Sequence, residues 1–161
     1  MINGIHHTTI ATEDLDRLRG FYEGLMGFEV RWEGSWEAGS QIPDEITGLK
    51  DSAARFCMLW TGNSYLELFQ FSSPEPIPPP GFRRACDPGF THVCFDVTDI
   101  YAEYRRLSAA GIEFLTDPKE VLGVRSTYGR DPDGNLLELQ EVVDHEVIRL
   151  PGQPSSKGEE A

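Results

Sequence analysis

Apolar and polar residues alternate with two different periods along the chain, and the two periods follow each other in the same order twice. A strand-like run at 5–11 is followed by apolar residues at helical spacing over 15–25. The same succession returns with a run at 90–97 and a helical pattern over 100–107. This internal repeat indicates two copies of one structural module.

Each helical pattern has residues suited to its two ends. An aspartate stands directly before each helix, where its carboxylate can accept hydrogen bonds from the free amides of the first turn. A glycine follows each helix, where the chain must leave the helical path. The N-capping residues are Asp14 and Asp99, and the glycines are Gly27 and Gly111.

Strands are expected after each helix. The next strand lies at 28–32 in one module and at 112–115 in the other, and each module closes with a strand containing Glu-Leu, at 64–69 and 135–140. The Asp-Pro-Asp-Gly-Asn sequence at 131–135 strongly predicts a turn before the last strand. Each module therefore has the predicted order β-α-β-β-β, and the fold class is α+β.

The two modules are expected to form one domain. A length of 161 residues with 39% hydrophobic content suits one domain or two small fused modules. A proline-rich linker at 73–88 joins modules at about 3–72 and 89–142, so the single domain spans 1–143. The polar residues 144–161 are expected to be a frayed tail.

Charge and cysteine content limit the kinds of partner and compartment. The formal net charge of −13, without any basic run, argues against a nucleic-acid partner. No segment reaches the roughly 20 apolar residues that span a bilayer, so no membrane partner is expected, and the first residues lack the features of a signal peptide. Three cysteines without a Cys-x-x-Cys pair fit a reducing compartment. We expect a cytoplasmic protein that acts on a small-molecule substrate.

Two histidines and two glutamates occupy matching places in the two modules. His7 and His92 each lie seven residues before the capping aspartate, and Glu67 and Glu138 each stand between two leucines. Because strand side chains alternate between faces, all four point away from the apolar face that covers the helix. We therefore expect them to project into one concave side and to bind a divalent metal ion, either Zn²⁺, Ni²⁺, Co²⁺, Mn²⁺ or Fe²⁺.

These motifs resemble those of the vicinal-oxygen-chelate superfamily, which includes glyoxalase I, methylmalonyl-CoA epimerase, extradiol dioxygenases and bleomycin-resistance proteins. The resemblance runs from Ile5 to Val142, and its most specific part is Asp-Pro-Asp-Gly-Asn-Leu-Leu-Glu-Leu, which ends at Leu139. It implies two βαβββ modules that form a cupped eight-stranded mixed sheet around a metal site, and a homodimer.

The acidic residue at the Glu67 position separates the reactions of this superfamily. The resemblance implies that extradiol dioxygenases hold their metal with two histidines and one carboxylate, and that they have no acidic ligand at this position. Four protein ligands leave about two positions on a six-coordinate ion, which suits a metal-bound enolate or enediolate of a small oxygenated substrate. We therefore expect an isomerase, epimerase or lyase of the glyoxalase or epimerase type. Two alternatives stay open: an Fe(II)-dependent ring-cleaving dioxygenase, and a non-catalytic drug-binding resistance protein.

Four residues are candidates for catalysis. Glu138 or Glu67 would move the proton, as a ligand carboxylate that dissociates from the metal when substrate binds. The resemblance to glyoxalase I, in which a ligand glutamate is similar to such a base, supports this role. The alternative base is Glu45, in the extra segment 36–54 of the first module, which is either a lid or a surface excursion. The sequence distance between Tyr128 and Glu138 resembles that of a tyrosine which lies beside the metal in the dioxygenases. The alternative role of Tyr128 is packing within the sheet.

The tryptophans are large apolar side chains whose position decides the shape of the site. Packing in the core is their expected role, and the wall of a pocket is the alternative. They are Trp32, Trp36 and Trp60.

Overall fold

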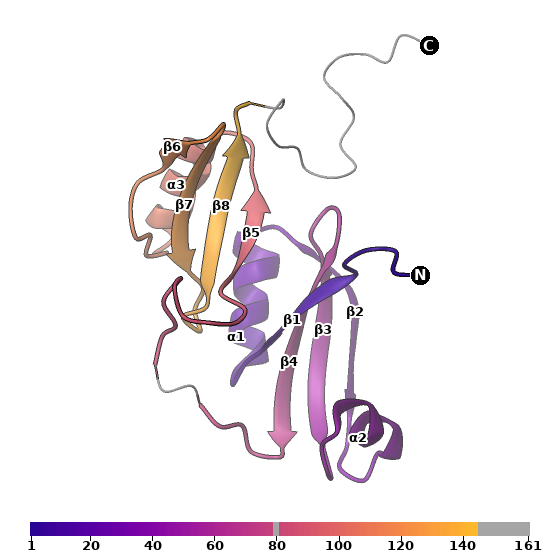
Figure 1. The fold of residues 1–161 in the computed structure, drawn as a ribbon. Helices are drawn as coiled ribbons and strands as arrows, with labels where there is room; N and C mark the ends of the chain where they lie inside the picture. Colours follow the sequence, from indigo (N-terminus) through magenta and orange to yellow (C-terminus); the bar gives the residue numbers. More distant parts are fainter. Residues whose placement is uncertain (79–80, 145–161) are drawn as a thin grey trace. The chain divides into compact units, whose positions relative to one another are not determined.

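The computed structural model describes residues 1–78 and 81–144. Its contacts divide the chain into two compact units, Met1–Gly81 and Phe82–Ala161, each with its own sheet (Figure 1). The boundary between the two units falls within the predicted proline-rich linker at 73–88. The tail predicted from residue 144 lies outside the described residues, except for Asp144 itself.

Unit 1 contains four strands and three helical segments. In its sheet the order is β1-β4-β3-β2; β1 is parallel to β4, and the other pairs are antiparallel. The order along the chain confirms the β-α-β-β-β prediction, with one further helix before the third strand. The elements are β1 (His7–Ala11), α1 (Leu15–Arg19), η1 (Gly20–Leu25), β2 (Glu29–Trp36), α2 (Gln41–Thr47), β3 (Ala53–Trp60) and β4 (Tyr65–Ser73).

Within residues 82–144, unit 2 repeats this plan without a counterpart of α2. Its sheet has the order β5-β8-β7-β6, with β5 parallel to β8 and the other pairs antiparallel. The eight strands are thus divided between two mixed sheets of four, which confirms the α+β class. The elements are β5 (His92–Asp96), α3 (Ile100–Ala109), β6 (Lys119–Val121), β7 (Val124–Arg130) and β8 (Leu136–Val142).

Each sheet buries one face against its helix. In unit 1, α1 contacts β3 and β4, and in unit 2, α3 contacts β8. Burial of each apolar side chain of this kind stabilises the fold by about 1.5–3 kcal/mol. The leucines on both sides of each predicted glutamate ligand are part of these cores, so the glutamates face away from the helices. The buried leucines are Leu15, Leu18, Leu59, Leu66 and Leu68 in unit 1, and Leu107, Leu136, Leu137 and Leu139 in unit 2.

The predicted helix caps are present in both units. The Asp14 carboxylate accepts from the Arg17 backbone N–H at 3.0 Å, and the Asp99 carboxylate accepts from the Ala102 backbone N–H at 3.0 Å. The helical pattern predicted over 15–25 is also confirmed, but from Gly20 its hydrogen bonds widen to those of a π-helix. None of the described helices is long and apolar enough to cross a membrane.

The strand predicted at 112–115 is wrong. Only Phe114 bridges to the neighbouring strand, opposite Gly129, and the regular strand is β6, which begins at Lys119. Pro118 has no backbone N–H to donate, so the segment before β6 does not extend the ladder. The short strand therefore lies a few residues further along the chain.

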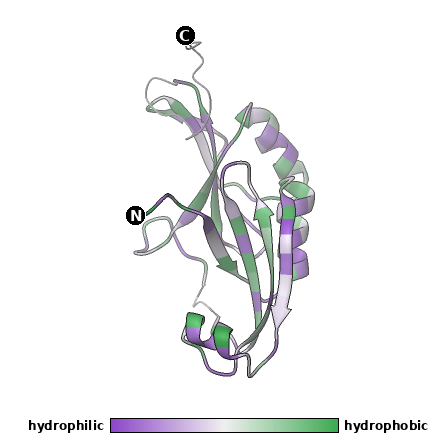
Figure 2. Ribbon diagram, turned by 90° about the vertical axis from the view of Figure 1, so that its right-hand side faces the viewer, coloured by the Kyte–Doolittle hydropathy of each residue, from purple (hydrophilic) through white to green (hydrophobic). Residues whose placement is uncertain are grey.

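The extra segment of unit 1 forms a helix that is fixed at the end of the sheet (Figure 1). The Asp44 carboxylate accepts from the backbone N–H groups of Asp51 and Ser52, at 2.8 Å each. A hydrogen bond from the Ser52 side chain, followed by the one from the Ser52 backbone N–H, lowers the pKa of Asp44. The indole N–H of Trp36 donates to the Ser52 hydroxyl at 3.0 Å. Figure 2 shows hydrophobic and hydrophilic residues together on α2. Ile46 on this helix is exposed.

The turn before β8 depends on the buried carboxylate of Asp131. One oxygen accepts from the backbone N–H groups of Asp133 (3.0 Å) and Asn135 (2.9 Å), and the other accepts from the Asn135 amide (2.9 Å). We predict that Asp131→Ala lowers the free energy of unfolding by about 2–3 kcal/mol, because three donors lose a charged acceptor. Urea titration followed by circular dichroism would measure this. Asp131→Asn keeps one acceptor oxygen and should lose less. Equal stability of Asp131→Ala and the wild type would contradict the prediction.

Candidate functional site

In unit 1, parallel pairing of β1 and β4 brings the predicted histidine and glutamate together. The register aligns His7 with Tyr65 and Thr9 with Glu67, so these side chains share the face opposite α1. The distance from His7 Nε2 to Glu67 Oε2 is 3.5 Å, and the Thr9 hydroxyl donates to the same glutamate oxygen at 2.9 Å. Glu67 is only 8% exposed, although it is the acidic residue of an apolar strand. Burial and one hydroxyl donor thus hold its carboxylate in place.

Unit 2 builds the equivalent pair. His92 Nε2 lies 3.1 Å from Glu138 Oε2, and the Ser126 hydroxyl donates to the other oxygen of Glu138. His92 Nδ1 is 2.9 Å from the Thr91 hydroxyl, and its ring meets Tyr128 edge-on at 5.0 Å between centroids. Each repeat therefore brings its predicted histidine and glutamate together.

The hydroxyls that hold the two glutamates were missed from the sequence. Thr9 follows His7 by two residues, so strand alternation alone would have placed it on the same face. Ser126 lies on another strand, and only the β7–β8 register shows that it reaches Glu138. The position of Thr9 could therefore be inferred from the sequence, whereas the position of Ser126 could not.

The donor atoms fit a divalent cation. Two neighbouring ligands at about 2.0–2.2 Å from one ion are about 3.0–3.5 Å apart, and the two N···O distances are 3.5 and 3.1 Å. Imidazole nitrogen and carboxylate oxygen are both common ligands of such ions. Within residues 1–78 and 81–144, no group of three or more His, Cys, Asp or Glu residues could hold a metal. Each unit thus supplies half of the predicted set of four.

The two glutamates have different surroundings. In the antiparallel ladders, Glu67 stands opposite Met58 and Glu138 stands opposite Tyr128. Desolvation, followed by the charge of Glu138, raises the pKa of Tyr128 to about 12. The same causes raise the pKa of the Cys94 thiol, next to Glu138 in the β5–β8 ladder, to about 12. At neutral pH both groups are protonated, so Glu138 has more donors around it than Glu67.

The alternative base Glu45 lies on α2. It is exposed, and its carboxylate accepts from the Gln41 side-chain amide at 2.6 Å. In the part of unit 1 that the structure describes, no hydrogen bond or ion pair links Glu45 to His7 or Glu67. The structure therefore does not bring Glu45 to the histidine–glutamate pair of its own unit.

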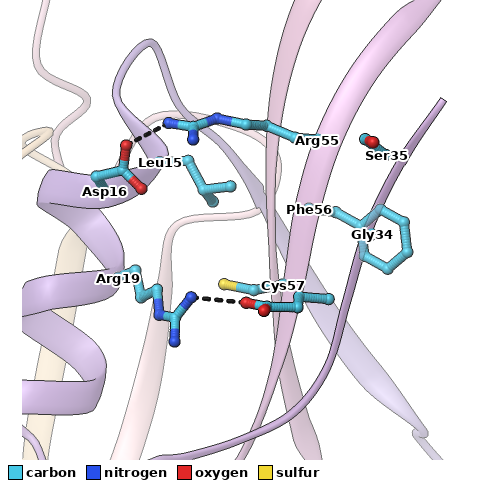
Figure 3. A pocket seen from close by; sticks show the side chains of 9 residues that line it. Leu15, Asp16, Arg19, Gly34, Ser35, Arg55, Phe56 and Cys57 are labelled. Atoms are coloured by element: carbon cyan, nitrogen blue, oxygen red, sulfur yellow. Dashed lines mark hydrogen bonds and ion pairs between the residues drawn. The ribbon is translucent and has the colours of Figure 1, made fainter. Parts of the chain in front are cut away.

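A separate groove of about 290 Å³ lies beside α1 (Figure 3). Its lining residue Cys57 stands opposite Leu68, next to the Met58–Glu67 pair, so the groove is on the other face of the sheet from Glu67. Its charged groups are paired: Arg19 with Glu33 at 2.7 Å, and Arg55 with Asp16 at 2.5 Å. Burial raises the pKa of Cys57, which also lines the groove, to about 11. A neutral thiol and satisfied ion pairs offer no reactive group, so we assign this groove to packing of the helix on the sheet.

The motifs and the fold agree with a known family. The model of the Glyoxalase/Bleomycin resistance protein/Dioxygenase superfamily matches residues 4–139. The chain belongs to this superfamily. The match covers both histidine–glutamate pairs, so the resemblance inferred from the sequence motifs is confirmed.

Similar proteins in this superfamily include enzymes. Metallothiol transferase FosB from Shouchella clausii is 28% identical over 143 residues, which cover 86% of this chain and 80% of the relative. An ethylmalonyl-CoA/methylmalonyl-CoA epimerase from Cereibacter sphaeroides is 27% identical over 148 residues, which cover 88% and 100%. The crystal structure of a glyoxalase family protein from Bacillus cereus, 25% identical, superposes with a TM-score of 0.80 over 89% of this chain and 97% of that one.

Proposed function

We propose that the protein is a divalent-metal-dependent isomerase, epimerase or lyase that moves a proton at a carbon next to a carbonyl group. The metal ligands in this proposal are His7, Glu67, His92 and Glu138. The observation that carries it is the pairing of a histidine with a glutamate, at ligand spacing, at the same place in both units. We further propose that the protein acts on a small molecule as a homodimer, and that it is cytoplasmic. Its three free cysteines support the proposed reducing compartment.

The ligand types define what the ion would contribute. Nitrogen and oxygen donors without thiolate suit Zn²⁺, Ni²⁺, Co²⁺, Mn²⁺ or Fe²⁺. When bound, such an ion supplies Lewis acidity that stabilises negative charge on a substrate oxygen. The proton itself must be taken and returned by groups of the protein.

The two glutamates proposed as ligands differ in the number of hydrogen-bond donors around them. Hydrogen bonds to a carboxylate stabilise its charged form and so lower its proton affinity. Glu138 is next to three donors, the hydroxyls of Ser126 and Tyr128 and the Cys94 thiol. Glu67 accepts from Thr9 and stands opposite an apolar methionine. We therefore assign proton abstraction to the Glu67 carboxylate. In this proposal Glu138 acts as a metal ligand only, and Glu45 takes no part in the proton transfer.

Hydrogen–deuterium exchange tests this function. Hydroxyacetone, 2-hydroxyacetophenone and methylmalonyl-CoA each carry a C–H bond next to a carbonyl. Zn²⁺-loaded protein in D₂O should exchange that hydrogen of at least one probe, as seen by proton NMR, and EDTA should stop the exchange. Metal-loaded protein that exchanges none of the three would contradict the proposed reaction.

Tyr128 is placed to donate a hydrogen bond to an anionic substrate oxygen. Its hydroxyl lies 3.5 Å from His92 Nε2 and keeps its proton at neutral pH, since its pKa is about 12. We predict that Tyr128→Phe lowers the exchange rate about 10²–10³-fold, the usual cost of removing one such donor, with little change in metal content. An unchanged rate would leave Tyr128 as a packing residue of the sheet.

The position of Tyr128 also favours the dioxygenase alternative, because the metal-side tyrosine was the sequence feature that resembled it. That reaction needs Fe(II) and a free ligand position at Glu67. Oxygen uptake by Fe(II)-loaded protein with catechol distinguishes the two functions. We expect none, because Glu67 lies beside His7. Rapid uptake together with absent proton exchange would favour the dioxygenase.

A further inference from the structure

Five aromatic side chains form a continuous layer on the face of unit 1 that also carries Glu67. The strand register places them on this face. Trp32 aligns with Met58 and Glu67 across β2, β3 and β4. The next two rows on the same face are Gly34–Phe56–Phe69 and Trp36–Ala54–Phe71. Neighbouring rings in the layer lie 5.0 to 6.2 Å apart between centroids. We call this layer the aromatic wall; it consists of Trp32, Trp36, Phe56, Phe69 and Phe71.

The wall is held rigidly. The Phe56 ring lies over Gly34, where an added Cβ would be only 3.0 Å from a ring atom. A side chain at position 34 would therefore push the ring away. The Trp36 indole is fixed at the other end by its hydrogen bond to Ser52. A surface of fixed rings favours a flat ligand of definite shape over a flexible polypeptide.

The wall continues directly from the metal-binding pair. Phe69 follows Glu67 by two residues on the same face of β4. Across the described stretch that aligns 32–36 with 54–58 and 67–71, Glu67 is the only charged side chain on this face. A ligand whose oxygen atoms bind at His7 and Glu67 thus meets a charge-free aromatic surface on one side.

The wall keeps open apolar surface. Trp32 is 60% exposed, and the other four rings are half-buried. The helix that packs on this sheet covers the opposite face, where Leu66 and Leu68 are buried. Within unit 1, the aromatic face is therefore the face that α1 leaves uncovered.

We propose that the aromatic wall binds an aromatic ring of the substrate, and that the substrate is an aryl compound with two neighbouring oxygen functions. This inference rests on the proposed function, since the oxygen atoms are those bound at the metal site. It narrows the substrate class from small oxygenated molecules to those with a flat apolar group next to the oxygen pair.

Two probes that differ only in this group provide the test. 2-Hydroxyacetophenone carries a phenyl group where hydroxyacetone carries a methyl group, and both have the same pair of oxygens. Calorimetric titration of Zn²⁺-loaded protein should give about 10- to 100-fold tighter binding of the phenyl compound, because it buries more apolar surface. In ¹⁵N-labelled protein the indole signals of Trp32 and Trp36 should shift strongly.

A matched pair of variants separates the wall from general apolar binding. Trp32→Ala removes an exposed ring from an edge strand, so the unit should still fold. We expect it to weaken 2-hydroxyacetophenone binding about tenfold and to leave hydroxyacetone binding unchanged. Ile46→Ala removes another exposed apolar side chain, on α2, and should change neither affinity.

The outcomes distinguish this inference from the proposed function. Equal affinity for both probes, or an unaltered phenyl affinity in Trp32→Ala, overturns the aryl assignment even if the protein holds its metal. Failure to bind any of Zn²⁺, Ni²⁺, Co²⁺, Mn²⁺ and Fe²⁺ refutes the metal proposal. Millimolar 2-hydroxyacetophenone should then still shift the Trp32 and Trp36 signals. No shift under those conditions overturns the wall as a ligand surface. Light scattering that shows dissociation of Trp32→Ala would assign the face to a second copy instead and overturn the proposal.

Discussion

Loss of one histidine from either unit is expected to empty the metal site. Wild-type protein dialysed against Zn²⁺ should carry close to one ion per chain, and His7→Ala and His92→Ala should each retain a small fraction of that. The metal binds only the folded protein, so its loss should also remove the stabilisation it provides. That stabilisation is about 4 kcal/mol when free metal exceeds the dissociation constant a thousandfold. Atomic emission and thermal unfolding with and without EDTA would measure both effects.

His6 supplies the control for this experiment. It precedes His7 in the sequence, its ring nitrogen lies 2.8 Å from that of His7, and it stacks on Tyr65. It has no counterpart in the second unit. We therefore expect His6→Ala to keep its metal. Full occupancy in both His7→Ala and His92→Ala would refute the ligand set, and loss in only one of them would assign the ion to a single unit.

The second large effect concerns the proton. Glu67→Gln, reloaded with Zn²⁺, is expected to exchange the probe hydrogen about 10²–10⁴-fold more slowly than the wild type, which is the usual contribution of a general base. Glu138→Gln is the matched variant, because it makes the same change at the equivalent place in the other unit. It should bind metal more weakly, yet at saturating Zn²⁺ it should keep an exchange rate within about tenfold of the wild type.

Metal content must be measured in the same samples. If both variants hold Zn²⁺ and Glu138→Gln is the slower, the roles of the two glutamates are reversed. If both exchange at the wild-type rate, neither carboxylate carries the proton. The comparison then moves to Glu45→Gln, since Glu45 was the other acid that the sequence brought forward.

Local sequence rules predicted those features of the fold that depend on neighbouring residues. The N-caps at Asp14 and Asp99 use amides three residues further along, and both formed as expected. The alternation that turned Glu67 and Glu138 away from the helices needs only the strand period. These rules placed both histidine–glutamate pairs because each of the four residues lies on a strand with a clear apolar face.

Features that depend on pairing between strands were not predicted. The strand expected at 112–115 was displaced to Lys119–Val121, because the partner strand and Pro118 decide where the ladder resumes. The tryptophans were expected in the core, whereas Trp32 is exposed and joins Trp36 in an aromatic layer that only the β2–β3–β4 register reveals. Sequence distance carries no information about such a register.

The contrast between Met58, opposite Glu67, and Tyr128, opposite Glu138, shows what gene duplication makes possible. Two identical subunits around a symmetry axis must present identical neighbours to both carboxylates, so any change that tunes one also alters the other. Two copies within a single polypeptide are free of that constraint. One half can have an apolar residue opposite its glutamate, while the other has a hydroxyl opposite its own. Different surroundings for two equivalent carboxylates are thus a property that two identical subunits could not acquire by point mutation.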